Sequence, residues 1–125
     1  MKNKFDNLDT AGRVKPRLLF TGGGGAGTEA LLRLLSPSYE VFFADAELGA
    51  KHFSVADYQW HQIPFANEPE FSSEIFNLCH RLKIDLLIPT VDEELLPIAK
   101  VSKDFKFDVL LPPEYFLSRH LDKLT

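Results

Sequence analysis

Residues 17–27 read RLLFTGGGGAG, a short apolar run followed at once by a cluster of glycines. The apolar run predicts a buried strand, and the glycines predict a tight loop directly after it. Three leucines then recur at helical spacing: Leu31, Leu34 and Leu35. Pro37 ends this pattern, because the residue before a proline is pushed out of the helical region. The sequence therefore predicts a strand, a glycine loop and a helix in succession.

Strand and helix patterns continue to alternate along the chain. The further expected strands are residues 39–44, 58–63, 85–90 and 108–111. The further expected helices are residues 71–82, a helix starting near the acidic residues 92–94, and a last helix opened by Pro112 and Pro113. Residues 46–57 show no clear pattern and are expected to be a loop. Pro97 should kink the middle helix or move its regular part toward Pro97, since proline lacks the backbone N–H.

This alternation predicts an α/β fold of three layers, in which helices cover both faces of a mostly parallel five-stranded sheet. The expected strand order is 3-2-1-4-5, a Rossmann-like arrangement. In such a sheet, ligands bind outside the carboxyl ends of the strands at the point between the first and fourth strands. The glycine loop and the turn at 89–92 should meet there.

Composition limits the classes of function. The 125 residues are 45% hydrophobic and 26% charged, which is typical of one globular domain. We expect a flexible segment at 1–15 and a folded domain at 16–125. The net charge of −4 offers no basic surface for nucleic acid or anionic lipid, and no apolar run is long enough for a membrane span. Cys79 is the single cysteine and is expected to be an inert core thiol in a cytoplasmic protein.

The glycine loop satisfies the pattern G-x-G-x-x-G between a strand and a helix. Its glycines are Gly22, Gly23, Gly24, Gly25 and Gly27. Glycines let the backbone approach a ligand closely, and free N–H groups at a helix start favour an anion. The alternative is a loop that only packs the following helix close to the sheet.

Asp45 ends the second expected strand, where a dinucleotide-binding domain places the carboxylate that binds a ribose. A solvated carboxylate at a strand end is the alternative for this residue. A P-loop is disfavoured, because Thr28 and Glu29 stand where its lysine would hold phosphates. Taken alone, the loop and Asp45 favour a nucleotide ligand such as NAD.

Other chemistry is sparse in this sequence. The four histidines are scattered without the spacing of metal ligands, so no metal site is expected. Cys79 and His80 are adjacent on a helix and point about 100 degrees apart, which disfavours a catalytic pair. Asp92, Glu93 and Glu94 either face solvent at a helix start, where acidic residues suit the dipole, or contact a substrate amine or hydroxyl.

Four pieces of the sequence carry a family resemblance: residues 17–27, 41–45, 84–95 and 121–123. In their order and separation they resemble the pre-ATP-grasp domain of carbamoyl-phosphate-synthase-like ligases. The resemblance covers residues 16–125, and its most specific piece is I-P-T-x-D-E-E at 88–94. It favours a ligase over an NAD-binding protein.

The resemblance implies a parent enzyme that uses ATP and Mg²⁺ to turn a carboxylate into an acyl-phosphate, which an amine or another nucleophile then attacks. In this family ATP is held between two later lobes, and the first domain supplies a wall of the substrate site. The positions carried over are the glycine loop, Gly22 to Gly27, and the turn from Thr90 to Glu94, with Thr90, Asp92 and Glu93 as expected small-molecule contacts.

Two features depart from the family. Pro97 falls in a helix that is expected to be unbroken, and the chain ends at residues 122–125 where the family continues into the ATP-gripping lobes. We therefore expect no ATP or Mg²⁺ site and no complete catalytic centre in this chain, and we expect the lobes to lie in the same parent chain or in a partner subunit. The alternative is an NAD(P)- or nucleotide-binding module of an oxidoreductase, a sugar-modifying enzyme or a regulatory protein.

Overall fold

The computed structural model describes residues 8, 9, 11–22, 27–47 and 60–111. Its strands are β1 (Arg17–Phe20), β2 (Glu40–Asp45), β3 (Trp60–Gln62), β4 (Leu86–Ile88) and β5 (Asp108–Val109). Its helices are α1 (Thr28–Leu35), α2 (Phe71–Arg81) and α3 (Asp92–Val101), with a short 3₁₀ turn at Ser102–Asp104. Most of the expected loop at 46–57 and the expected helix after Pro112 lie outside the described residues.

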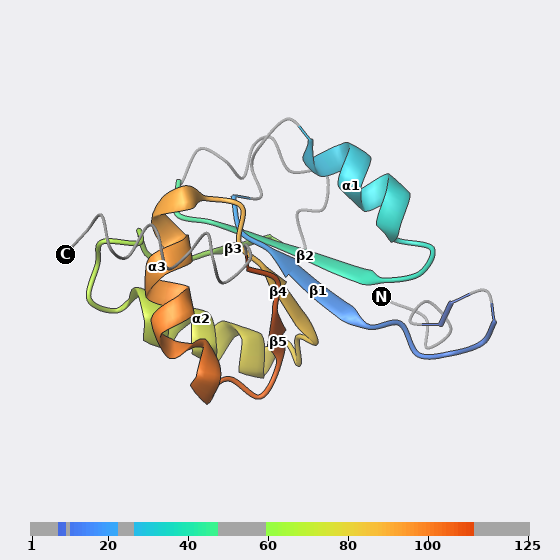
Figure 1. Cartoon of the computed structure of the whole chain (residues 1–125). Helices are drawn as coiled ribbons and strands as arrows, with labels where there is room; N and C mark the ends of the chain where they lie inside the picture. Colours follow the sequence, from blue (N-terminus) through green and yellow to red (C-terminus); the bar gives the residue numbers. More distant parts are fainter. Residues whose placement is uncertain (1–7, 10, 23–26, 48–59, 112–125) are drawn as a thin grey trace.

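The five strands form one parallel sheet in the order β3-β2-β1-β4-β5, which confirms the predicted topology (Figure 1). The central strand is β1, where Leu19 pairs with Phe42 on one side and with Leu87 on the other. The central strands are short and nearly all apolar because both faces of the sheet are covered.

Successive residues of the strands point to opposite faces, which divides the core into two clusters. Leu18 and Phe20 of β1 belong to the cluster under α1, together with Val41 and Phe43 of β2. Leu19 belongs to the larger cluster on the opposite face, under α2 and α3 (Figure 1).

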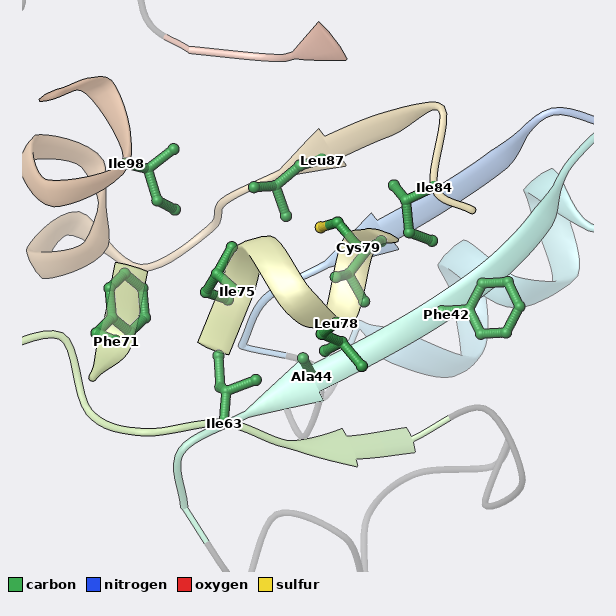
Figure 2. Packing of buried hydrophobic residues seen from close by; sticks show 11 residues of the cluster. Phe42, Ala44, Ile63, Phe71, Ile75, Leu78, Cys79, Ile84, Leu87 and Ile98 are labelled. Carbon is green, nitrogen blue, oxygen red and sulfur yellow. The ribbon is translucent and has the colours of Figure 1, made fainter. Parts of the chain in front are cut away.

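The larger cluster is built around Leu87 of β4, which is fully buried. Ile75 and Cys79 of α2 and Ile98 of α3 gather around it (Figure 2). The apolar spacing from Phe71 onward therefore predicted the buried face of α2 correctly. The two helices hold β4 firmly, and with it the start of the turn at its carboxyl end.

The first helix differs from the prediction at one position. Leu34 is 75% exposed, whereas Leu32, which the predicted stripe omitted, packs on the sheet with Leu31 and Leu35. Leu31 and Leu35 lie on one side of this eight-residue helix, and Leu32 and Leu34 flank that side in opposite directions, so the rotation of the helix decides which of the two is buried. The spacing alone did not fix that rotation.

Helix α3 begins at Asp92 and runs continuously to Val101 with Pro97 inside it. The expectation of a helix that starts nearer to Pro97 is therefore wrong. Pro97 has no N–H to donate to the carbonyl of Glu93 four residues earlier, so one helical hydrogen bond is missing. Burial of Ile98 keeps the helix against the sheet despite that loss.

The amino-terminal edge of the sheet is held by Arg17. Its N–H donates to Asp85 Oδ2 at 2.7 Å, and its guanidinium donates to Glu40 Oε2 at 3.2 Å and to the carbonyl of Leu82. The guanidinium also lies over the ring of Phe42, 5.3 Å from its centroid. These contacts join β1 to β2, to β4 and to the end of α2, at the edge opposite the candidate site.

Candidate functional site

The end of β1 and the turn after β4 are bonded directly to each other. The N–H of Thr90 donates to Thr21 Oγ1 at 2.9 Å, and the Thr90 hydroxyl donates to the Thr21 carbonyl at 2.5 Å. The N–H of Thr21 in turn donates to the carbonyl of Ile88 at 3.2 Å. The two segments that the sequence predicted to meet therefore do meet, and we call Thr21, Gly22 and Thr90 the β1/β4 corner.

Gly22 is required at this corner by packing. Its φ is +63°, and a Cβ at this position would lie 2.6 Å from Thr90 Oγ1 and 3.2 Å from Val91 Cγ2. Gly27 has no such need, because a Cβ there would meet nothing within 4 Å. Gly23, Gly24 and Gly25 lie outside the described residues. Whether the glycine loop contacts a ligand stays a prediction.

A pocket of about 490 Å³ opens beside the corner, at the carboxyl edge of the sheet. Its lining comes from the end of β2, the segment after β3 and the start of α3. The lining residues are Asp45, Ala46, Glu47, Phe65, Ala66, Asn67, Val91, Glu93 and Glu94. The pocket therefore combines apolar walls with four carboxyl groups.

Only some of the predicted site residues line this pocket. Asp45 ends β2 and accepts the N–H of Glu47 at 3.0 Å, and it lines the pocket together with Glu93. Thr90 is engaged at the corner, and Asp92 is exposed at the start of α3; neither is among the lining residues. Of these four candidates, the structure brings together Asp45 and Glu93.

Glu94 was not among the expected small-molecule contacts, which included its neighbours Asp92 and Glu93. Its side chain is 3% exposed, and its Oε1 has no hydrogen-bond partner within the described part of the chain. One signal was present in the sequence: Glu94 lies four residues before Ile98, which places both on the buried face of α3. An acidic residue in phase with a buried apolar residue indicates a functional carboxyl more strongly than its exposed neighbours do.

Burial raises the pKa of Glu94 from 4.5 to about 7, and the negative charges of Asp45 and Glu93 act in the same direction. A hydrogen bond from the Thr21 hydroxyl opposes this rise in pKa. Because Thr21 Oγ1 already accepts the N–H of Thr90, its own proton is available for the Glu94 carboxyl. The β1/β4 corner thus orients Glu94 toward the pocket.

The charge of the pocket does not suit phosphate groups. None of its described lining residues is Lys, Arg or His, the side chains that neutralise a polyphosphate. The described residues also contain no group of three or more His, Cys, Asp or Glu side chains that could hold a metal ion. The described lining of this pocket therefore does not fit the polyphosphate of ATP.

Two further residues have structural roles. Cys79 is fully buried, and burial raises the pKa of its thiol to about 12, which makes it unreactive. His80 is exposed and stacks on Phe76 with 6.1 Å between ring centroids. Within the described ranges, no helix has the length and apolar character needed to cross a bilayer.

Comparison with known proteins decides the family. Residues 19–111 match the family described as PylC-like, N-terminal domain. The chain belongs to this family. The PylC-like N-terminal domain is a pre-ATP-grasp domain of ATP-grasp ligases, which confirms the resemblance found in the sequence. The match includes the β1/β4 corner and every described residue that lines the pocket.

Other comparisons add little to this assignment. A crystal structure of a short chain dehydrogenase from Leptospira borgpetersenii serovar Hardjo-bovis, with bound NAD⁺, shares 23% identity with a TM-score of 0.43. That match covers 83% of this PylC-like domain, which spans 44% of the length of the dehydrogenase chain. This agreement is too low to assign a function. None of the curated proteins matches the chain.

Proposed function

We propose that this PylC-like domain is the substrate-side wall of an ATP-grasp ligase that joins a carboxylate to an amine, as in the large subunit of carbamoyl-phosphate synthase. The observation that carries the proposal is the β1/β4 corner, which orients a buried carboxyl toward a pocket at the strand ends. Ligands of open α/β sheets bind at this edge. The corner provides rigidity, and the pocket provides a shape for a small molecule.

The proposal assigns ATP, and the Mg²⁺ that accompanies it, to other lobes of the ligase, because four carboxyl groups line this pocket and repel a polyphosphate. When bound there, ATP supplies the phosphoryl group that activates the carboxylate. The residues of this chain would bind and orient the substrate against that centre. Asp45, Glu93 and Glu94 would act at the pocket, while Gly22 and Thr90 would hold its geometry.

The alternative is a dinucleotide module with Asp45 on the ribose, and it is favoured only by the position of Asp45 at the end of β2. Isothermal titration of the whole chain with NAD, NADP and Mg–ATP separates the two functions. The ligase proposal predicts no binding of NAD or NADP. Binding of NAD that disappears in Asp45→Ala would support the dinucleotide module and overturn the proposal.

A chimaera gives the positive test. The host is an active ligase whose own N-terminal domain is PylC-like, and this chain would be inserted in place of that domain. ADP release would be followed with and without the amine substrate. The proposal predicts amine-dependent ADP release that falls in Gly22→Ala, where the added Cβ disturbs Thr90. A chimaera that folds by circular dichroism but releases no ADP would contradict it.

A further inference from the structure

We propose that the pocket beside the β1/β4 corner binds the positively charged ammonium group of an alkylamine, with the Glu94 carboxylate as its central acceptor. The inference rests on the proposed function, since it specifies what the substrate wall recognises. It assigns to this edge of the sheet a cation, where a glycine loop alone would suggest an anion.

The first argument is the unpartnered oxygen of Glu94. A buried carboxyl oxygen without a hydrogen bond is costly, so such atoms in a folded protein call for an explanation. Glu94 is only 3% exposed, yet it lines the pocket and its Oε1 has no partner among the described residues. An ammonium group entering the pocket would donate a hydrogen bond to that atom and neutralise the charge.

The second argument is the sign of the surrounding charge. Asp45, Glu47 and Glu93 line the same pocket, and no described lining residue carries a positive charge. The charges of Asp45 and Glu93 act on Glu94 directly and raise its pKa. Carboxyl groups gathered in one pocket attract a cation and repel carboxylates and phosphates.

The third argument is the apolar part of the pocket wall, which favours an organic cation over a metal ion. Phe65, Ala46, Ala66 and Val91 supply apolar surface beside the carboxyl groups. Such a surface suits the methylene groups of an alkylamine, as in other sites that bury an apolar body and fix a polar end. A hydrated metal ion gains nothing from these walls, and the described residues offer no metal-ligating cluster.

Glu94 is suited to the central role because its second contact is fixed. The Thr21 hydroxyl lies near enough to the carboxyl to lower its pKa, and Thr21 itself is 1% exposed and bonded to Thr90. The carboxyl group is therefore held in place before the ligand arrives. Binding to such a fixed carboxyl costs less side-chain conformational entropy than binding to an exposed, mobile carboxyl such as that of Glu93.

The test uses three probes of equal length and different charge: pentylamine, pentanol and pentanoate. Binding to the whole chain is followed by chemical shifts in NMR spectra at neutral pH. The inference predicts saturable binding of pentylamine and none of pentanoate, with pentanol weaker by about tenfold or more because it lacks the charge. Equal affinity for pentanol and pentylamine would overturn it.

Matched variants locate the binding group. Glu94→Gln should weaken pentylamine binding by about tenfold or more, whereas Asp92→Asn, which removes the same charge from an exposed residue outside the pocket, should change it by less than about twofold. Asp45→Asn gives a second variant within the pocket and should weaken binding as well. Equal losses in Glu94→Gln and Asp92→Asn would show only a general charge effect and would overturn the inference.

Two outcomes separate this inference from the proposed function. If the chimaera releases ADP with its amine but the chain binds no pentylamine, the ammonium site is wrong and the ligase function stands. If pentylamine binds through Glu94 but the folded chimaera is inactive, the site stands and the ligase function fails. Displacement of pentylamine by equimolar magnesium chloride would assign the carboxyl groups to a metal ion and overturn the inference.

Discussion

The buried carboxyl of Glu94 should make the stability of the domain fall as pH rises. Its pKa in the folded chain is about 7, above the ordinary value of 4.5. Between these two values the folded chain holds the proton more firmly than the unfolded chain, so unfolding releases protons and becomes easier at higher pH. The stabilising contribution is full below the unfolded pKa and is lost as pH rises through the folded pKa.

The size of this effect follows from the rise in pKa. Each pKa unit corresponds to about 1.4 kcal/mol, so a rise from 4.5 to about 7 is equivalent to about 3 kcal/mol. Glu94→Gln keeps the shape of the side chain and removes its ionisation. The free energy of unfolding of the variant, relative to the natural chain, should therefore increase by about 3 kcal/mol between pH ~4 and pH ~8.

Urea unfolding at several pH values measures this difference. Other groups also titrate in the same interval, so the difference between the two chains at each pH is the quantity of interest. Asp92→Asn is the matched control, because Asp92 is exposed, lies outside the pocket and is not among the charges that raise the pKa of Glu94. Parallel stability curves for Glu94→Gln and the natural chain would refute the buried, proton-binding carboxyl.

Three further predictions concern packing. Gly22→Ala should destabilise the domain by about 2 kcal/mol, because Gly22 has a φ of +63° and an added Cβ would collide with Thr90. In a double-mutant cycle measured by urea unfolding, adding Thr90→Ala should recover part of that loss. Strictly additive effects of the two substitutions would argue against the contact. Pro97→Ala should raise stability by about 1–3 kcal/mol by restoring the hydrogen bond to the Glu93 carbonyl, seen as a higher Tm; an unchanged Tm would contradict this. The thiol of Cys79 should resist Ellman's reagent until the chain unfolds, and rapid labelling of the native chain would show an accessible sulfur.

The topology could be predicted from the sequence because strand and helix patterns alternate along the chain, although the alternation within the third expected strand, residues 58–63, is imperfect. The apolar run at 17–20 and its glycine loop placed β1, and the helical spacing from Phe71 placed α2. Strand order then follows from general rules for alternating α/β chains. The rotation of α1 was harder to predict, because either Leu32 or Leu34 can extend the apolar stripe of Leu31 and Leu35.

The candidate site was predicted less completely, because charge and burial are properties of the folded chain. The pattern at residues 88–94 correctly brought Thr90 to the end of β1, but it favoured Asp92 and Glu93 over Glu94. Three adjacent acidic residues look alike until the helix phase is known. The carboxyl group of Asp45 comes together with those of Glu93 and Glu94 only through the sheet order, because Asp45 lies far from them in the sequence.

The central position of β1 has a consequence for biosynthesis. Arg17 in β1 bonds to Asp85 beside β4, and 68 positions separate the two residues. At about 5–20 residues per second, a ribosome needs several seconds to add that length. During this time the apolar strand has a neighbour available on one side at most, and an open strand edge is a template for aggregation. Ribosome-associated chaperones should therefore bind nascent chains in which β4 has not yet emerged from the ribosome.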